Sequence, residues 1–349
     1  MNHEIHIDGT GIGNHYPPYI IAELSGNHNG DINRAMALLK VAKESGANAV
    51  KIQTYTADTM TIDCDKPDFL IEGGLWADKQ LYQLYEWAHT PWAWHQQLFD
   101  EAKKLGITIF SSPFDETAVD LLESLGAPAY KIASFELTDL MLIKKVAATG
   151  KPMIMSTGMA NQAEIQQAID TAHNGGCQDL IILHCISGYP TPIAGSNLNS
   201  IRRLQQDFDV CVGLSDHTLG VTAAITGVAL GAHVIEKHFT LDREDGGPDA
   251  AFSLEPDELK QLCETTRDAW SALGQCDYTT KEAEKPNLKF RRSIYVVEDV
   301  KKGEVLTEKN VRRIRPGFGL APKHYLEVLG KTASQDIQRG TAFDWGMVS

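Results

Sequence analysis

Two histidines occupy matching positions at the ends of two neighbouring apolar runs. His217 lies in the segment 213–218, and His238 lies in the segment 234–239. A helical segment separates the two runs, which is the pattern of adjacent strands in a parallel α/β fold. Neighbouring strands lie roughly 5 Å apart, so side chains at their carboxyl ends can share one metal ion. The pair therefore predicts a metal site formed by His217 and His238.

The type of ligand indicates the type of ion. Either histidine alone is more simply explained as a hydrogen-bonded core imidazole, but the matching positions favour ligation. Two imidazoles without a thiolate or a third histidine make a poor closed zinc site. They suit an open octahedral site completed by water and substrate, for which we expect Mn²⁺, with Mg²⁺ or Co²⁺ as alternatives. Such an ion acts as a Lewis acid on a carbonyl oxygen.

Lysines and serines follow the other apolar runs and predict an anion site. Lysine supplies a point charge, and hydroxyl groups supply oriented donors, which together suit a phosphate and a carboxylate. The alternative is that Lys51 or Lys131 forms a structural ion pair with Glu23 or Glu236, because a charge in a buried strand is unfavourable unless it is paired or used. Since several strands offer such groups together, we favour the anion site.

The elements that must position these residues alternate regularly between short apolar runs and helical stretches. Eight evenly spaced units favour a (β/α)8 TIM barrel over a doubly wound open sheet. Functional groups then gather at the carboxyl ends of the strands. The predicted strands are Tyr19–Leu24, Ala49–Tyr55, Ile107–Pro113, Ala129–Ser134, Pro152–Thr157, Leu180–Cys185, Val210–Ser215 and His233–Phe239.

Three further segments complete the predicted organisation. The insertion 56–91 interrupts the alternation and belongs on the catalytic face of the barrel. The last helix of the barrel, 255–273, is expected to have Ser253 as its N-cap. We predict a catalytic barrel over 1–274, a polar linker over 275–290, and a small β-rich domain over 291–349.

Composition limits the classes of function. The net charge of −14 argues against nucleic-acid binding. No apolar run is long enough for a membrane span, and the N-terminus does not show a signal-peptide pattern. We therefore expect a cytoplasmic protein that has reduced cysteines and no membrane partner. Residues 285–331 nevertheless hold 12 Lys and Arg against 5 Asp and Glu. This basic segment would attract the acidic remainder of the chain, within one chain or between two.

The motifs together resemble the sialic acid synthase family, and the resemblance covers nearly the whole chain. The C-terminal region resembles the family's antifreeze-like (SAF) domain. The motifs in the barrel are Ala22–Gly30, Lys51–Tyr55, Ser112–Asp115, Tyr130–Ser134, Ser156–Met159, Leu214–Thr218 and Glu236–Phe239.

The resemblance implies a condensation of phosphoenolpyruvate with an open-chain N-acylated amino sugar. It implies His217 and His238 as metal ligands and Glu23 as a proton handler or the holder of the attacking water. Arg315 would be supplied over the barrel mouth by a partner subunit, in a domain-exchanged homodimer. The residues implied around phosphoenolpyruvate are Lys51, Ser112, Lys131, Ser134, Ser156 and Ser215. Those implied around the sugar are Gln53, Glu136, Tyr189, Glu236, Asp249 and Arg315.

Departures from the neuraminate pattern point to one branch of that family. The segments 247–253 and 185–189 carry small or apolar residues where neuraminate synthases have His and Asn, and the segments 73–76 and 90–95 resemble the branch that makes pseudaminic acid. The expected sugar is 2,4-diacetamido-2,4,6-trideoxy-L-altrose. Neuraminate or legionaminate synthesis, an aldolase with a Schiff base on Lys131 or Lys237, and a non-catalytic sugar or ice binder remain alternatives.

Overall fold

The structure, a computed structural model, describes residues 4–349. The chain forms two compact units, residues 1–274 and 275–349, which are described separately. Within the described residues, eight parallel strands close into a barrel because β10 pairs with β3. The closed barrel that we predicted is confirmed. In chain order its strands are β3 (Tyr19–Glu23), β4 (Ala49–Thr54), β5 (Thr108–Pro113), β6 (Tyr130–Ile132), β7 (Met153–Ser156), β8 (Leu180–Cys185), β9 (Cys211–Asp216) and β10 (Val234–His238).

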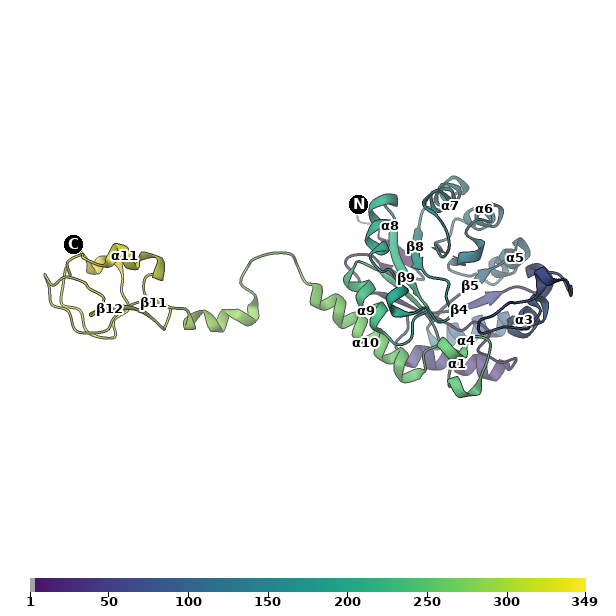
Figure 1. The fold of residues 1–349 in the computed structure, drawn as a ribbon, viewed down its shortest axis with the longest axis horizontal. Coiled ribbons are helices and arrows are strands. Elements are labelled where there is room, and N and C mark those ends of the chain that lie inside the picture. The colour runs from purple at the N-terminus through teal and green to yellow at the C-terminus, as the bar shows by residue number, and fades with distance from the viewer. Residues whose placement is uncertain (1–3) are drawn as a thin grey trace. The chain divides into compact units, whose positions relative to one another are not determined.

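Helices surround the barrel as an outer ring (Figure 1). The apolar face of each helix packs on the strands, so each helix has one buried face and one exposed face. The main helices are α1 (Ile32–Glu44), α4 (His95–Leu105), α5 (Glu116–Ser124), α6 (Leu140–Ala147), α7 (Gln162–Gly175), α8 (Ser200–Phe208), α9 (Thr222–Ala229) and α10 (Pro256–Leu273).

The predicted N-cap of α10 was wrong. Glu255, not Ser253, caps the helix, and its backbone N–H donates to Glu258 Oε2 at 2.9 Å. Pro256 occupies the first helical position, so the residue directly before it must take the cap. The Ser253 hydroxyl instead donates to the carbonyl of Asp249 at 2.7 Å and accepts from Asn27 Nδ2 at 2.8 Å. Ser253 therefore ties together two loops at the barrel mouth.

The barrel interior is apolar at its amino-terminal end. Inward-facing residues such as Ile21, Phe110 and Ile154 form one buried cluster, which the short hairpin of β1 (Ile5–Ile7) and β2 (Thr10–Ile12) completes. Since side chains along a strand alternate between the two faces, residues two positions further on point the same way. Polar residues occupy the next layer toward the carboxyl ends.

The insertion after β4 and the short turns after other strands cover the carboxyl end of the barrel. Residues 70–80 fold back on themselves, with the Ile71 N–H donating to the Lys79 carbonyl at 3.0 Å. The short elements of this end are α2 (Ala57–Met60), η1 (Pro67–Phe69), α3 (Leu81–Ala88), η2 (Trp92–Trp94), η3 (Ser134–Glu136), η4 (Ile193–Gly195), η5 (Arg243–Asp245) and η6 (Ala250–Phe252).

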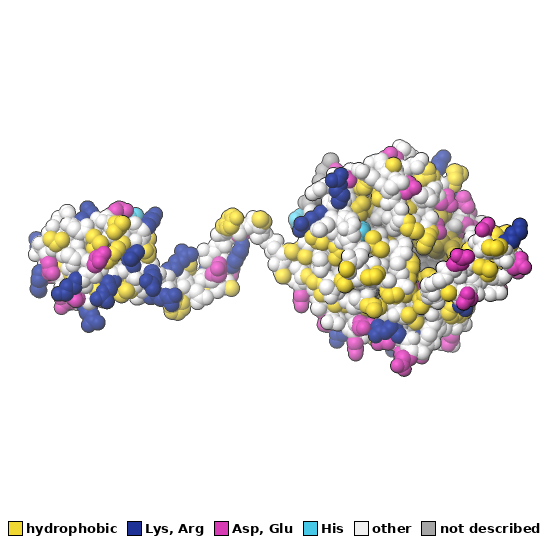
Figure 2. Space-filling model, in the orientation of Figure 1, with side chains coloured by type: hydrophobic (Ala, Val, Ile, Leu, Met, Phe, Trp, Pro, Cys, Tyr) yellow, Lys and Arg dark blue, Asp and Glu magenta, His cyan; other side chains and the backbone are white. Residues whose placement is uncertain are grey.

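The second unit has a small core of its own around Ile294, Leu306 and Phe343. Residues 275–290 are exposed throughout and contain one 3-10 helix. Lys and Arg side chains are frequent over the visible face of this unit (Figure 2). Across residues 4–349, the helices are too short or too polar to cross a membrane. The elements of this unit are η7 (Glu282–Phe290), β11 (Ser293–Val296), β12 (Val311–Ile314), η8 (Pro322–His324), α11 (Tyr325–Val328) and η9 (Trp345–Met347).

Candidate active site

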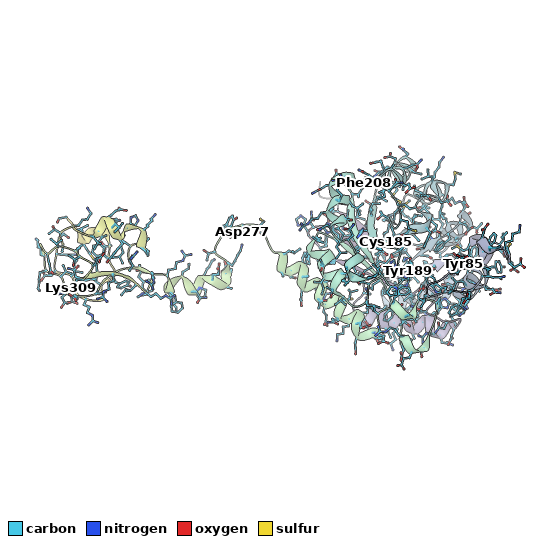
Figure 3. The ribbon with its side chains drawn as sticks, in the orientation of Figure 1. Tyr85, Cys185, Tyr189, Phe208, Asp277 and Lys309 are labelled. Atoms are coloured by element: carbon cyan, nitrogen blue, oxygen red, sulfur yellow. The ribbon has the colours of Figure 1, made fainter. Side chains whose placement is uncertain are left out.

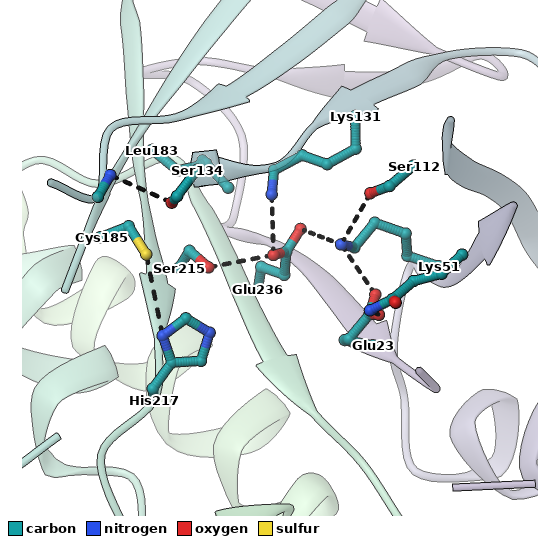
Figure 4. Close-up of polar contacts among 12 residues, drawn as sticks. Glu23, Lys51, Ser112, Lys131, Ser134, Leu183, Cys185, Ser215, His217 and Glu236 are labelled. Atoms are coloured by element: carbon teal, nitrogen blue, oxygen red, sulfur yellow. Dashed lines mark hydrogen bonds and ion pairs between the residues drawn. The ribbon is translucent and has the colours of Figure 1, made fainter. Parts of the chain in front are cut away.

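Four buried charged residues meet at the carboxyl end of the barrel and are called the lysine half: Glu23, Lys51, Lys131 and Glu236. Lys51 Nζ lies 2.9 Å from Glu23 Oε2 and 3.5 Å from Glu236 Oε2. Lys131 Nζ lies 3.1 Å from Glu236 Oε1. Glu236 therefore lies between the two lysines and pairs with both (Figure 4). From the sequence, a structural ion pair and an anion site were alternative interpretations of these lysines. The observed geometry is compatible with both.

Polar side chains from neighbouring strands complete the lysine half. Ser112 Oγ accepts from Lys51 Nζ at 3.2 Å, and Ser215 Oγ donates to Glu236 Oε1 at 3.1 Å. Gln53 Nε2 donates to Glu23 Oε1 at 2.8 Å. These contacts hold the two carboxylates and the Lys51 ammonium group in place.

The two carboxyl groups of the lysine half differ in their affinity for protons. Burial opposes ionisation of Glu236, but Lys131 and Lys51 outweigh it and lower the pKa of Glu236 to about 2. For Glu23 the balance is reversed, because burial and repulsion from Glu236 raise its pKa against the pull of Lys51. Glu236 is thus a fixed anion, while Glu23 is the member of the pair able to hold or release a proton.

A second group of residues, called the histidine half, lies beside the first: His217, His238, Tyr189, Asp249 and Phe252. The rings of His217 and His238 have centroids 5.4 Å apart, and Tyr189 lies 4.5 Å from His217. Phe252 lies 4.8 Å from His238. Asp249 Oδ2 is 3.7 Å from His238 Nδ1. The two predicted ligands therefore face each other at one side of the mouth.

The two imidazoles fit an open metal site. His217 Nδ1 donates to the carbonyl of Ile186 at 3.0 Å, which leaves its Nε2 available as a ligand. His238 Nδ1 is buried and lacks a hydrogen-bond partner among the residues described. No group of three or more His, Cys, Asp and Glu side chains is arranged for a metal within residues 4–349, so water and substrate would supply the other ligands.

An aromatic wall made by Trp76, Tyr189 and Phe252 borders the histidine half. The ring centroid of Tyr189 lies 5.6 Å from that of Trp76 and 5.3 Å from that of Phe252, with the rings tilted to each other. Trp76 Nε1 donates to the carbonyl of Pro248 at 2.7 Å, which fastens the insertion to the loop after β10. Figure 3 shows Tyr189 and Cys185 within the ring of helices. Such a wall can contact apolar groups of a ligand but offers few hydrogen bonds.

The other predicted residues fall in different places. Ser134 Oγ accepts from the Gly158 N–H at 3.1 Å, and Ser156 Oγ is buried without a hydrogen-bond partner in the described chain. Glu136 lies in η3, and burial raises its pKa to about 7. Arg315 is exposed and belongs to the second unit, so the barrel by itself does not supply it.

Two features of the site were missed in the sequence. Lys237 Nζ lies 2.8 Å from Asp216 Oδ2, and both side chains are 1% exposed, so an ion pair joins the strands that carry the two histidines. The motifs contained both residues, and their charge within apolar strands was the available signal. Cys185 Sγ lies 3.8 Å from His217 Nδ1, a contact that no local pattern indicated.

Comparisons with known proteins agree with this geometry. A model of the NeuB family matches residues 38–278, and a model of the SAF domain matches residues 291–349. A pseudaminic acid synthase of Campylobacter jejuni is 48% identical over 324 residues, which cover 93% of this chain and 94% of that protein. A pseudaminic acid synthase of Helicobacter pylori is 46% identical, with coverage of 93% and 96%.

More distant relatives match most of the chain. An N,N'-diacetyllegionaminic acid synthase of Campylobacter jejuni is 40% identical and covers 91% of this chain and 96% of that protein. Among solved structures, an N-acetylneuraminic acid synthetase from Leptospira borgpetersenii, crystallised with citrate, superposes with a TM-score of 0.75 at 30% identity. The match covers 83% of this chain and 97% of that one.

Proposed function

Because the chain belongs to the NeuB family, we propose that it condenses phosphoenolpyruvate with 2,4-diacetamido-2,4,6-trideoxy-L-altrose and water to give pseudaminic acid and phosphate. The observation that carries the proposal is the meeting of the lysine half and the histidine half in one barrel mouth. An anion site beside an open two-histidine site suits the joining of an anionic enol to a sugar aldehyde. The similarity to relatives named pseudaminic acid synthase supports this choice of sugar.

The lysine half would bind phosphoenolpyruvate. Lys51 and Lys131 would neutralise its phosphate and carboxylate, with hydroxyl donors from Ser112, Ser134, Ser156 and Ser215. Since Glu236 stays ionised, it holds both lysine charges in place before the substrate arrives. Preorganised charge of this kind is worth more in a buried site than in water.

The histidine half would hold the ion and the sugar. A divalent ion, which we propose to be Mn²⁺, would polarise the aldehyde oxygen when bound to His217 and His238. Gln53, Glu136, Tyr189, Glu236 and Asp249 would orient the sugar, and Arg315 would come from a partner subunit of a domain-exchanged dimer.

The chain's own residues then handle the bond changes. A carbon–carbon bond forms between the methylene carbon of phosphoenolpyruvate and the aldehyde carbon. Water adds to the carbon that bears the phosphate, and phosphate leaves. Glu23, whose burial favours the protonated form, would hold this water or move its proton.

Phosphate release from phosphoenolpyruvate with Mn²⁺ tests the proposal. We expect release with the trideoxy sugar, no release without sugar, and a product whose mass equals that of the sugar, phosphoenolpyruvate and water together less the released phosphate. N-acetylmannosamine and the legionaminate precursor form the comparison panel. Release only with one of those two sugars would overturn the choice of sugar, and no release with any of them would overturn the proposed reaction.

The same assay, with borohydride added, distinguishes the proposed reaction from that of a Schiff-base aldolase. Lys237 is tied to Asp216 and to the carbonyl of Thr218, and Lys131 is paired with Glu236. Burial lowers the pKa of both lysines, which is the usual preparation of an amine nucleophile. We expect borohydride to trap no adduct during turnover. A trapped adduct on either lysine would contradict the proposed mechanism.

A further inference from the structure

Ser25 has a backbone conformation that serine rarely adopts. Its φ is +42°, and it occupies the first central position of a turn closed by the Asn27 N–H to the Leu24 carbonyl at 3.0 Å. Turns with positive φ at this position are dominated by glycine, because a Cβ is strained there. Serine therefore carries local strain that glycine would avoid.

Packing around the turn explains why the strain persists. A Cβ on the next residue, Gly26, would approach Pro248 Cγ at 2.4 Å and the Ala88 carbonyl oxygen at 3.0 Å. The turn is thus wedged between the loop after β10 and the end of α3. This packing and the bond from the Asn27 N–H to the Leu24 carbonyl hold the turn without a hydrogen bond from the Ser25 side chain.

The Ser25 hydroxyl is buried near a carboxylate but is not held by a hydrogen bond of normal geometry within the described residues. Ser25 is 1% exposed, and its Oγ finds no hydrogen-bond partner in residues 4–349. Glu23, two residues earlier, is equally buried, so this degree of burial is ordinary for the barrel mouth. A buried hydroxyl without a partner is unfavourable unless a ligand satisfies it.

The surroundings of Ser25 identify the kind of ligand. The turn that holds Ser25 packs against Pro248, the residue directly before Asp249, since a Cβ on Gly26 would lie 2.4 Å from Pro248 Cγ. The Ser25 hydroxyl accordingly opposes the rise that burial causes in the pKa of Asp249. Asp249 Oδ2 is also 3.7 Å from His238 Nδ1. Ser25 therefore lies beside Asp249 of the histidine half. A donor next to a carboxylate suits a hydroxyl or acetamido group better than a phosphate.

We propose that Ser25 is a sugar-binding residue, whose Oγ–H donates to an oxygen of the acceptor sugar while Asp249 accepts from a neighbouring O–H or N–H of the same sugar. This rests on the proposed function for the identity of the sugar. It adds to the site a residue that the motif contained but to which no role was assigned. The strain at Ser25 is then retained for binding, not for folding.

Two substitutions separate binding from structure. Ser25→Ala removes the hydroxyl and keeps the strained Cβ, whereas Ser25→Gly removes both. We expect both variants to bind the sugar about tenfold more weakly, the value of roughly one neutral hydrogen bond. Ser25→Gly should nevertheless melt at or above the wild-type temperature, since it relieves the backbone. Asn197→Gly, at an exposed position with φ +46°, is the matched control and should leave binding unchanged.

The measurement is calorimetric titration with the open-chain alditol of the trideoxy sugar, which lacks the reactive aldehyde, in the presence of Mn²⁺. Phosphoenolpyruvate is titrated in parallel and should bind wild type and variants alike. Unchanged alditol affinity in both Ser25 variants, an equal loss for phosphoenolpyruvate, or no alditol binding by the wild type would overturn the proposal. If the wild type binds the alditol but does not turn over the sugar, the result counts against the proposed reaction. The affinities of the two Ser25 variants for the alditol would still test whether Ser25 binds the sugar.

Discussion

The two halves of the barrel mouth are built in different ways. In the lysine half each buried charge has a partner within the chain, with Glu236 between Lys51 and Lys131. In the histidine half, His238 Nδ1 and Ser25 Oγ are buried without hydrogen-bond partners in the described residues. The charges of the lysine half are therefore paired as folded, whereas we propose that an ion and a sugar complete the histidine half. Substitutions in the lysine half should affect stability and activity together, and those in the histidine half should separate them.

Removing a lysine should disrupt the ion pairs of the lysine half. Lys51→Met leaves Glu23 without its cation and weakens the pairing of Glu236, which should lower the free energy of unfolding by about 3–5 kcal/mol. Turnover should fall at least about a hundredfold, since an oriented charge is lost. Chemical denaturation and phosphate release measure the two effects. Lys151→Met, which breaks a partly exposed pair with Glu123, is the control and should lose less than about 1 kcal/mol.

Removing a histidine tests the opposite expectation for the second half. His217→Ala or His238→Ala should reduce turnover by about a thousandfold, because the ion supplies several kcal/mol of charge stabilisation. The melting temperature of metal-free His238→Ala should change little, since His238 makes no hydrogen bond through Nδ1 within the described chain. His217→Ala also loses the bond to the Ile186 carbonyl and should be less stable by about 1 kcal/mol. Full activity in the double variant would remove the basis for a metal at this position.

The aromatic wall should affect which sugar the histidine half accepts and should not affect phosphoenolpyruvate binding in the lysine half. Trp76→Ala should lower kcat/KM for the trideoxy sugar by about tenfold and leave the KM of phosphoenolpyruvate unchanged, because the Trp76 ring lies against Tyr189 of the histidine half. Trp76→Phe keeps a ring and should lose less. Equal losses for both substrates would mean that Trp76 supports the fold and does not select the sugar.

Glu136 should show a pH-dependent effect on stability. Burial raises its pKa to about 7 in the folded protein, above the unfolded value of about 4.5. The folded state then holds the proton more tightly, so the stability that Glu136 contributes is present below about pH 4.5 and is lost as the pH rises through 7. Glu136→Gln should thus be more stable than wild type by about 1–3 kcal/mol at pH 8, with no gain at pH 4.5. A gain at both pH values would point to a cause other than ionisation.

Much of this architecture was predictable from the sequence because buried parallel strands leave a strong pattern. The apolar runs indicated the strands, and charged residues within them, such as Lys51 and Glu236, indicated the site. The register of the paired strands places these residues at the same level of the barrel. What could not be predicted depends on contacts distant in the chain. Examples are the bond from Trp76 to the Pro248 carbonyl and the bridging of both lysines by one carboxylate. The N-cap error has a local origin, since Pro256 at the first helical position places the cap at Glu255.

Separate titration of the two ligands tests the division of the mouth most directly. Mn²⁺ and phosphoenolpyruvate would each be titrated calorimetrically into wild type and into the His217→Ala/His238→Ala variant. The variant should lose Mn²⁺ binding and still bind phosphoenolpyruvate within about tenfold of wild type, because Lys51, Lys131 and their hydroxyl partners are unchanged. Retained Mn²⁺ affinity, or complete loss of phosphoenolpyruvate binding, would contradict the account.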